Sequence, residues 1–352
     1  MIPPGETIGI LGGGQLGRMI AMAAAQLGYR THVYAPEADA VAAEVSGAFT
    51  NAAWDDGAAL TRFAADCAVI TYEFENVPTG ALAALGDKPL LPCGRALEVA
   101  QDRIAEKDFV TGLGGRPAPY MAVDSAADLA RAAREIGTPG ILKTRRDGYD
   151  GKGQWRIGSV AEADALQLPD APMVYEGFVD FRAEFSVILC RSAAGDVRFW
   201  DTPENVHKGG ILARSTVPGG ALVQGEVAEA RKLARKVAEA LDYVGVLTLE
   251  FFATRAGPVF NEMAPRVHNS GHWTIEGAVT SQFENHVRAI CGLPLGETRL
   301  AANGVTMENL IGEDAHDWPA ILSDPANHLH LYGKAAARPG RKMGHVTRLI
   351  LK

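Results

Sequence analysis

The alternation of strand and helix signals over the first third of the chain restricts its fold most strongly. An apolar run at Thr7–Leu11 is typical of a buried strand, a glycine-rich turn follows it, and Arg18–Leu27 has the composition of an alanine-rich helix. Thr31–Ala35 and Ala68–Tyr72 are further apolar runs of strand length. Because strands that alternate with helices form parallel, doubly wound sheets, residues 1–115 are predicted to be one α/β unit.

A glycine- and proline-rich segment, Gly112–Pro119, indicates a domain boundary after this unit. Residues 116–182 are predicted to form a small domain. Residues 183–352 are predicted to form a third, mixed domain that ends in short strands and turns from about residue 300. The expected helices are Asp128–Ile136, Val227–Leu241 and Thr280–Ile290, and the expected strands are Gly140–Lys143, Met173–Glu176, Glu184–Cys190, Val246–Ala253 and Pro258–Met263. The predicted fold class therefore combines α/β and α+β architecture.

Composition limits the classes of function. The net charge is −8, from 34 basic and 42 acidic residues, which argues against broad binding of nucleic acid. No stretch has the length and apolarity of a membrane span, and the N-terminus lacks the pattern of a signal peptide, so a cytoplasmic protein is expected. Cys67, Cys93, Cys190 and Cys291 form no CxxC pair, so they are interpreted as free thiols rather than zinc ligands.

The turn after the first strand, Gly12–Gly17, fits the GxGxxG pattern and opens a helix. Glycines at such a turn permit close backbone approach, and a helix N-terminus favours anions. A dinucleotide site would also have an acidic residue at the end of the second strand, where this chain has Tyr34-Ala35-Pro36. Three interpretations therefore stay open: a dinucleotide, another phosphate, or tight packing of strand and helix.

A second glycine-rich loop, Lys143–Gln154, follows the strand of the small domain. Lys143 at the strand end is placed to reach a phosphate, and the glycines allow the loop N–H groups to wrap around it. The loop does not have the GxxxxGK[ST] pattern of a Walker A motif. A solvated basic loop is the alternative, which the density of glycine and charge directly after a strand disfavours.

Two glutamates mark a predicted hairpin in the third domain. Glu250 lies in an otherwise apolar strand, and Asn261-Glu262 lie in the next strand, with Thr254–Gly257 as the turn. If the loop has an odd number of residues centred on Ala256, Glu250 and Glu262 oppose each other. Opposed carboxylates repel, and a hard cation such as Mg²⁺ removes that repulsion. The alternative is a solvent-facing pair, which the apolar neighbours disfavour.

The segment Ala264–Trp273, directly after the carboxylates, is rich in hydrogen-bond donors. An arginine such as Arg266 can grip a planar oxyanion through two parallel N–H groups. His268 can transfer a proton or donate a hydrogen bond, and a binding role is expected for Asn269 as well. A packing role is expected for His272 and Trp273.

Several polar residues are more ambiguous when each is read alone. Glu73 and Glu75 follow a strand at the edge where open α/β sheets bind ligands, yet either could be solvated. The run Gln101–Arg103 could be ordinary capping of a helix, and Glu184 and His207 could be structural. The basic run Lys334–Lys342 is either a solvated tail or a phosphate clamp.

Taken together, these motifs resemble one family, the 5-(carboxyamino)imidazole ribonucleotide synthetases of purine biosynthesis, which belong to the ATP-grasp superfamily. The similar segments run in order along nearly the whole chain: Gly12–Arg18, Tyr72–Pro78, Gln101–Lys107, Lys143–Gln154, Asn261–Thr274 and Tyr332–Val346. The resemblance implies an ATP-grasp fold with a Rossmann-like first domain, a small lid domain and a C-terminal domain. The sequence departs from the family pattern at Tyr34-Ala35-Pro36.

The resemblance also implies roles for individual residues. Magnesium, with Mn²⁺ as the alternative metal, would be held by Glu250 and Glu262. Bicarbonate would face Arg266, His268 and Asn269. The 5-aminoimidazole ribonucleotide would be surrounded by Gln15, Glu73, Glu75, Tyr149, Asp150, Lys334 and Arg341. ATP would be bound by Arg103, Lys143, Gly148, Tyr149, Asp150, Gly151, Lys152, Gly153, Gln154, Glu176, Gly177, Phe178, Val179, Glu184, His207, Asn261 and Glu262.

The activity that the resemblance implies is the carboxylation of the ribonucleotide's amine by bicarbonate through carboxyphosphate. Asp150 would either orient the amine or accept its proton. A cytoplasmic homodimer with small-molecule substrates is expected. The alternatives are a formate- or glycine-using purine ligase, a nicotinamide oxidoreductase built on Gly12–Gly17, and an inactive nucleotide-binding partner.

Overall fold

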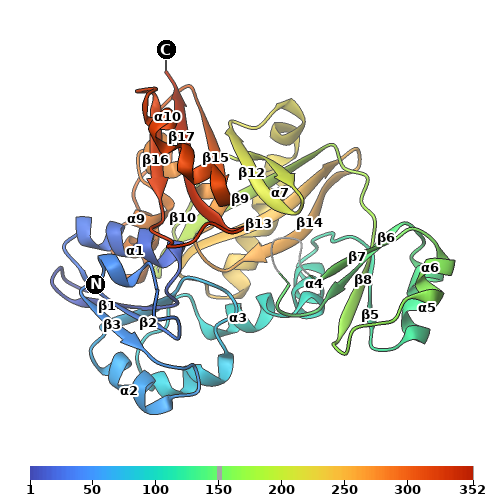
Figure 1. Ribbon diagram of the computed structural model, residues 1–352, viewed down its shortest axis with the longest axis horizontal. Helices are drawn as coiled ribbons and strands as arrows, with labels where there is room; N and C mark the ends of the chain where they lie inside the picture. The colour runs from blue at the N-terminus through green and yellow to red at the C-terminus, as the bar shows by residue number, and fades with distance from the viewer. Residues whose placement is uncertain (149–152, 352) are drawn as a thin grey trace.

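The computed structural model describes residues 1–148 and 153–351. Within these residues the chain forms three β-sheets. Figure 1 shows the N-terminal sheet in blue, a small sheet with two helices in green at the opposite end of the molecule, and the large sheet in yellow to red.

The N-terminal sheet is parallel with the strand order β3-β2-β1-β4, which confirms the predicted architecture. Its elements are β1 (Thr7–Leu11), α1 (Gln15–Gln26), β2 (Arg30–Ala35), η1 (Ala43–Val45), β3 (Ala48–Asn51), α2 (Gly57–Ala65), β4 (Val69–Tyr72) and η2 (Thr79–Leu85). Helix α1 begins three residues before the predicted Arg18. A small residue is needed at Gly17 within this helix, because a Cβ there would lie 3.2 Å from the Ala42 side chain.

Two helices, α3 (Gly94–Ala100) and α4 (Arg103–Gly112), lead from this sheet to the next. The Asp102 carboxylate caps α4 by accepting the backbone N–H groups of Ile104 and Ala105. The capping interpretation of the Gln101–Arg103 run is therefore confirmed for Asp102.

The small sheet is antiparallel, in the order β5-β8-β6-β7. Its elements are β5 (Tyr120–Val123), α5 (Ala126–Glu135), β6 (Gly140–Thr144), β7 (Gln154–Ile157), α6 (Val160–Ala165) and β8 (Met173–Gly177). Side chains such as Leu129, Leu142 and Tyr175 form an apolar cluster of its own between the sheet and the two helices. The small sheet therefore has a hydrophobic core separate from those of the other two sheets.

The large sheet is antiparallel and has nine strands among the described residues. Its path runs β14-β13-β9-β11-β12-β15-β17-β16, and β10 pairs with β9. The strands are β9 (Ala183–Arg191), β10 (Val197–Phe199), β11 (Glu204–Lys208), β12 (Ile211–Val217), β13 (Gly245–Thr254), β14 (Gly257–Ala264), β15 (Gly304–Ile311), β16 (Asn327–Leu331) and β17 (Lys342–Ile350). The accompanying helices are α7 (Ala221–Ala240), η3 (Asn269–Gly271), α8 (Thr274–Gly277), α9 (Gln282–Ile290), η4 (Gly312–Asp317) and α10 (Trp318–Leu322).

The C-terminal tail differs from the prediction of short strands. β15 has 8 residues and β17 has 9, and they pair with each other along their length. β15 also pairs with β12, so the tail continues the large sheet instead of folding separately. This pairing accounts for the length of the two strands.

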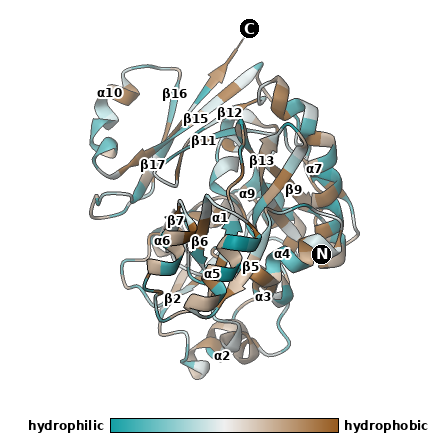
Figure 2. Ribbon diagram, turned by 90° about the vertical axis from the view of Figure 1, so that its right-hand side faces the viewer, coloured by the Kyte–Doolittle hydropathy of each residue, from teal (hydrophilic) through white to brown (hydrophobic). Residues whose placement is uncertain are grey.

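Helix α7 packs against β9 and β13 with one face, and Figure 2 shows apolar and polar stretches interleaved along it, as an amphipathic helix requires. Throughout residues 1–148 and 153–351, no helix combines the length and apolarity needed to cross a bilayer. Cys67, Cys190 and Cys291 are buried free thiols, as expected, while Cys93 is only partly buried.

One apolar cluster joins the N-terminal sheet to the large sheet. It contains Ile8 and Ile20 from the first unit together with Val287, Ile290 and Met307 from the last. A shared core holds these two units together, while the small sheet has a separate one. The domain limits near residues 115 and 182 remain a prediction.

Candidate active site

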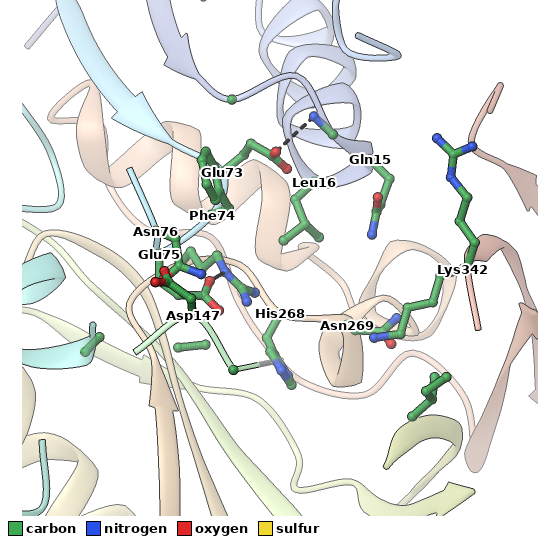
Figure 3. Close-up of a pocket in the computed structure, with 18 of the residues that line it drawn as sticks. Gln15, Leu16, Glu73, Phe74, Glu75, Asn76, Asp147, His268, Asn269 and Lys342 are labelled. Atoms are coloured by element: carbon green, nitrogen blue, oxygen red, sulfur yellow. Dashed lines mark hydrogen bonds and ion pairs between the residues drawn. The ribbon is translucent and has the colours of Figure 1, made fainter. Parts of the chain in front are cut away.

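A cavity of about 840 Å³ lies where the three sheets meet, which is within the usual range for a small-molecule site. Figure 3 shows side chains entering it from elements far apart in the chain. The predicted site residues among those that line it are Gln15, Glu73, Glu75, Arg103, Gly148, Glu250, Glu262, Arg266, His268, Asn269, Lys334 and Arg341.

The glycine turn after β1 is filled by a side chain of the protein itself. The Glu73 carboxylate, at the end of β4, accepts the N–H of Gly14 at 2.9 Å and that of Gly17 at 3.3 Å. A Cβ on Gly12 would lie 2.6 Å from Glu73 Cγ, and one on Gly14 would lie 2.7 Å from Glu73 Oε1. The glycines therefore permit the approach of Glu73, so the N–H groups of Gly14 and Gly17 are not available for a dinucleotide phosphate.

Burial raises the pKa of Glu73, and the two backbone N–H groups oppose that shift. The N-terminus of α1 favours the charged carboxylate at this point. Of the three interpretations of the GxGxxG turn, close packing is the one that the geometry supports.

A basic group from the C-terminal tail faces the same cavity. Lys334, Arg338, Arg341 and Lys342 line it, and Gln15 from the start of α1 points into the same space (Figure 3). Backbone carbonyls fix two of these side chains, because Lys334 Nζ donates to Lys342 at 2.7 Å and Arg341 Nη1 donates to Ala336 at 3.0 Å. Such a cluster suits a phosphate group.

Glu250 and Glu262 are cross-strand partners in the β13–β14 hairpin. The opposition was expected, but the expected odd-numbered loop centred on Ala256 is wrong. Thr254 pairs with Gly257, so the turn has two residues, and the register shifts between Glu250 and Phe251. Asn261 is the extra residue of a bulge, and the bulge restores the opposition that a two-residue turn alone would remove.

The two carboxylates have different surroundings. Glu250 is 9% exposed, and burial, followed by the charge of Glu262, raises its pKa to about 7. The Glu262 side chain is 43% exposed and receives Arg103 Nη1 at 3.2 Å. Desolvation of the carboxylate by the surrounding protein would raise the pKa of Glu262, but the charges of Arg103 and Lys143 lower it. Two neighbouring carboxylates repel each other, and their oxygens are ligands that suit a divalent cation.

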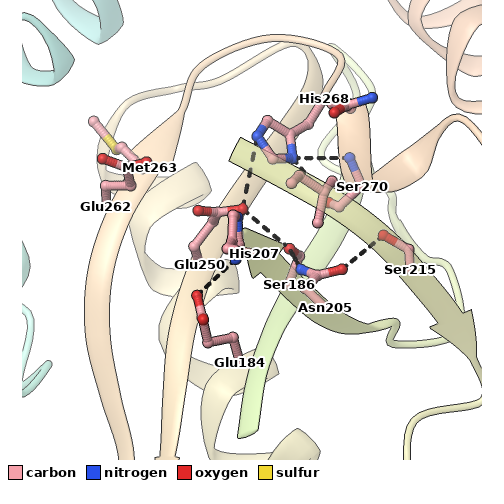
Figure 4. A network of polar contacts seen from close by, with 12 residues as sticks. Glu184, Ser186, Asn205, His207, Ser215, Glu250, Glu262, Met263, His268 and Ser270 are labelled. Atoms are coloured by element: carbon pink, nitrogen blue, oxygen red, sulfur yellow. Dashed lines mark hydrogen bonds and ion pairs between the residues drawn. The ribbon is translucent and has the colours of Figure 1, made fainter. Parts of the chain in front are cut away.

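A chain of hydrogen bonds runs behind Glu250 (Figure 4). Ser215 Oγ donates to Asn205 Oδ1 at 2.8 Å, Asn205 Nδ2 donates to Ser186 Oγ at 2.6 Å, and Ser186 Oγ donates to Glu250 Oε1 at 3.4 Å. All four side chains are buried. Every donor points toward the carboxylate, so the chain favours a charged Glu250.

Glu184 and His207, each ambiguous in the sequence, form a pair at 2.8 Å. Burial would lower the pKa of His207, but the hydrogen bond to Glu184 and the charge of Glu250 raise it. The pair lies beside Glu250 in Figure 4 and does not line the cavity itself.

Arg266 reaches across the cavity to the N-terminal unit. Its Nε forms a very short ion pair with Glu75, and its Nη1 donates to the Val267 carbonyl at 3.1 Å. Glu75 is therefore paired rather than solvated. These two contacts fix the orientation of the guanidinium at the cavity wall. Its other N–H groups take no part in them.

The surroundings of His268 favour the neutral form of its ring. Burial and then Arg266 hold its pKa well below the ordinary value. Its Nδ1 lies 2.8 Å from Ser270 Oγ and 3.3 Å from the Ser270 backbone nitrogen, whose N–H it accepts, so a neutral ring with this contact carries its proton on Nε2, 3.7 Å from Glu250 Oε1. The Asn269 amide exchanges hydrogen bonds with Asn309 at 2.9 and 2.8 Å. His272 and Trp273 are fully buried, as the packing interpretation requires.

The nucleotide residues predicted on the small sheet lie on its adjacent strands. Lys143 Nζ donates to Glu176 Oε2 at 2.8 Å, and Lys143 pairs with Gln154 across β6 and β7. The backbone N–H of Gly177 donates to the Pro119 carbonyl, and that of Phe178 donates to the Pro139 carbonyl. Val179 is the next residue along the chain. Tyr149, Asp150, Gly151 and Lys152 lie outside the described residues, and Gly153 is the first residue after them.

Sequence reasoning missed two buried charged residues beside this group, Glu106 and Lys107. Lys107 Nζ lies 3.2 Å from Glu176 Oε1, so that carboxylate is flanked by two lysines. Burial would raise the pKa of Glu176, but Lys143 and Lys107 lower it to about 2. The signal was present, because buried positions 103, 106, 107 and 110 of α4 have the spacing of a helix face.

Comparison with known proteins identifies the class. Family models match in order along the chain: a ribonucleotide synthetase preATP-grasp domain over residues 5–101, an ATP-grasp domain over 108–283, and a phosphoribosylaminoimidazole carboxylase C-terminal domain over 305–350. The chain is thus an ATP-grasp enzyme, with a parallel N-terminal sheet, a small antiparallel lid sheet and a large antiparallel C-terminal sheet.

Individual relatives identify the family within this class of enzymes. An N5-carboxyaminoimidazole ribonucleotide synthase of Brucella melitensis is 52% identical over 99% of this chain and 97% of its own length. The crystal structure of such a synthetase from Thermus thermophilus superposes with a TM-score of 0.90 at 47% identity, covering 97% of this chain and 93% of that one. The Aspergillus clavatus enzyme in complex with ADP and 5-aminoimidazole ribonucleotide has a TM-score of 0.87 at 30% identity, covering 98% and 94%.

The chain belongs to the N5-carboxyaminoimidazole ribonucleotide synthase family. It is a ligase of purine biosynthesis that forms this ribonucleotide from 5-aminoimidazole ribonucleotide and bicarbonate in an ATP-dependent reaction. The resemblance seen in the sequence is confirmed, and the oxidoreductase and the formate- or glycine-using ligase are set aside.

Proposed function

We propose that the reaction proceeds through carboxyphosphate and that Glu250 and Glu262 hold the magnesium ion that ATP brings to the site. The opposition of these two carboxylates across the β13–β14 hairpin carries the proposal. Both line the cavity, and Glu250 has a raised pKa that a cation would reverse. Bound there, magnesium supplies neutralisation of charge on the transferring phosphoryl group. Mn²⁺ suits the same oxygen ligands.

The nucleotide would lie between the small sheet and the large sheet. Lys143 and Arg103 are the positively charged side chains proposed to contact the nucleotide. Both are buried beside carboxylates that fix their positions. The segment Glu176–Val179 includes the last two residues of β8 and is suited to hold the base through its backbone groups. Glu184 with His207, and Asn261 beside Glu262, would complete the nucleotide site. The loop Gly148–Gln154 would cover the phosphates and exclude water, which would otherwise hydrolyse the activated carbonate.

Bicarbonate would lie against Arg266. Its planar guanidinium, already oriented by Glu75, can bind two oxygens of a carbonate side by side. His268 Nε2–H is a neutral donor next to Glu250, so it can bond a carbonate oxygen without adding charge. Asn269 would support this wall through its pair with Asn309.

The ribonucleotide would occupy the end of the cavity between the N-terminal unit and the tail. Lys334 and Arg341 would bind its phosphate, while Gln15 and Glu73 would contact the rest of the molecule. Tyr149 and Asp150 are proposed for the same substrate, with Asp150 orienting the amine or accepting its proton. The amine then attacks the carbon of carboxyphosphate, or CO₂ released from it, and inorganic phosphate leaves.

Labelled bicarbonate tests the carboxyphosphate route. Phosphoryl transfer to bicarbonate makes a carbon–oxygen–phosphorus bridge, so the oxygen of that bridge leaves with the phosphate. With ¹⁸O-bicarbonate, one labelled oxygen should appear in phosphate for each ADP released, measured by mass spectrometry. Unlabelled phosphate at full turnover would exclude the intermediate. A cytoplasmic location and a homodimer remain part of the proposal, and light scattering of the purified protein tests the dimer.

A further inference from the structure

Glu106 and Lys107, neighbours on helix α4, are almost completely buried, with exposures of 2% and 1%. Each contacts the backbone of strand β14. Glu106 Oε1 accepts the Met263 N–H at 2.6 Å, and Lys107 Nζ donates to the Asn261 carbonyl at 3.3 Å. The two bonded backbone groups therefore stand on either side of Glu262.

Strand β14 needs such contacts at this point. It is the terminal strand of the large sheet, and among the described residues its outer edge pairs with no further strand, only with Arg116, whose carbonyl accepts the Phe260 N–H at 2.8 Å. The bulge at Asn261 also interrupts the ladder with β13. The backbone groups of Asn261 and Met263 that β13 and Arg116 do not bond need other partners, and here α4 supplies both a donor and an acceptor.

Lys107 has a second partner, which extends the contact to the small sheet. Its Nζ lies 3.2 Å from Glu176 Oε1, and the other oxygen of Glu176 accepts from Lys143 at 2.8 Å. A continuous polar path thus runs from the Asn261 carbonyl through Lys107 and Glu176 to Lys143. It connects the hairpin of Glu262 to a lysine proposed for the nucleotide.

We propose that Glu106 and Lys107 are positioning residues of this reaction: Glu106 fixes the strand edge that carries Glu262, and Lys107 sets Lys143 relative to that edge. The inference rests on the proposed magnesium site at Glu250 and Glu262. Stability alone does not explain these residues, because well-packed apolar side chains are often as stable as a buried ion pair. Neither side chain needs to touch a substrate.

Glu106 is tested with three substitutions. Glu106→Ala removes the acceptor, so the Mg²⁺ concentration for half-maximal activity should rise about tenfold or more, as for other residues that orient metal ligands. Glu106→Gln keeps an oxygen for the Met263 N–H, so it should stay within about threefold of the parent. Glu106→Asp withdraws the acceptor by one methylene and should behave like Glu106→Ala, which keeps the test available if the alanine variant does not fold.

Val110→Ala is the matched control for packing. Val110 is fully buried on the same face of α4, and its side chain packs in an apolar cluster. It should lower Tm and leave the Mg²⁺ dependence and the KM for ATP unchanged. If Glu106→Ala likewise lowers only Tm, or if Glu106→Gln is as damaged as Glu106→Ala, the positioning role of Glu106 is wrong.

Lys107→Met tests the second half. The substitution keeps the length of the side chain but removes its ion pair with Glu176. Glu176 then still holds Lys143, but neither is connected to β14 any longer, so the KM for ATP should rise about tenfold. An unchanged KM, with only Tm lowered, would reject the role of Lys107. Glu262→Gln separates this inference from the proposed function: if that variant keeps a normal Mg²⁺ response, the metal site itself is wrong, whereas a lost response there with normal Glu106 and Lys107 variants refutes only the positioning.

Discussion

Glu250 faces Glu262 across the β13–β14 hairpin only because one extra residue, Asn261, is inserted between the turn and the pair. Side chains alternate between the two faces of a strand, so a shift by one residue would move one carboxylate to the other face. The bulge therefore decides whether the two glutamates can share a cation. It also places Asn261 at the point where Lys107 contacts the backbone.

The first prediction concerns the charge at this pair. Glu262→Gln keeps the shape and the hydrogen bond from Arg103 but removes a charged ligand. We expect kcat to fall roughly 100-fold, which corresponds to about 2.7 kcal/mol of transition-state stabilisation. A coupled ADP assay with both substrates saturating measures it. Glu229→Gln on helix α7 is the control, and turnover near the parent rate in Glu262→Gln would remove the metal assignment.

The second prediction is a dependence on pH. The pKa of Glu250 is raised from 4.5 to about 7, so between these values the folded protein keeps a proton that the unfolded chain has lost. The stability of the metal-free protein should therefore decrease as pH rises through this window. Magnesium competes with that proton, so the rise in Tm on adding Mg²⁺ with ADP should grow over the same range and then level off.

Thermal unfolding between about pH 5 and pH 8, with and without Mg²⁺ and ADP, measures both effects. Glu250→Gln has no proton to lose, so both slopes should flatten in that variant. If the parent and Glu250→Gln show the same pH dependence, the raised pKa does not belong to Glu250.

The sequence predicted the hairpin pair but not how it is formed. The opposition of Glu250 and Glu262 was predicted from an odd-numbered loop centred on Ala256, whereas the structure forms it with a two-residue turn and a bulge at Asn261, where the backbone contacts α4. Glu106 and Lys107 were missed for a related reason. Their spacing with Arg103 and Val110 is that of a buried helix face, but three of these four residues are charged, and a hydrophobic pattern does not register charges.

The N-terminal turn shows the same limit. Its glycines are visible in the sequence, but their partner Glu73 lies 59 positions from Gly14 and was placed beside the ribonucleotide by resemblance alone. A contact between two strand ends depends on the order of strands in the sheet, which composition does not encode. The parallel sheet itself was predictable, because local alternation of strands and helices determines it.

The third prediction follows from that contact. In Gly14→Ala the new Cβ would lie 2.7 Å from Glu73 Oε1 and displace the carboxylate from the N–H groups of the turn. Losing one charge-assisted hydrogen bond costs about 1.5 kcal/mol, so the KM for 5-aminoimidazole ribonucleotide should rise about tenfold. The KM for ATP should not change, because the turn lies at the other end of the cavity. In the control Gly80→Ala the Cβ meets nothing within 4 Å, and both constants should stay as in the parent.

The fourth prediction concerns the wall proposed for bicarbonate. Arg266→Lys keeps the positive charge but loses the planar group that bonds Glu75 and the Val267 carbonyl together. A lysine ammonium cannot present two parallel N–H groups to a carbonate, so one of two charged hydrogen bonds is lost. At about 1.5 kcal/mol per bond, the KM for bicarbonate should rise at least about tenfold, and the KM for ATP should change little. The exposed Arg299→Lys serves as the control for the substitution itself. Bicarbonate saturation that is the same in Arg266→Lys and in the parent would mean that the guanidinium only bridges the two units, and the carbonate would then have to bind elsewhere in the cavity.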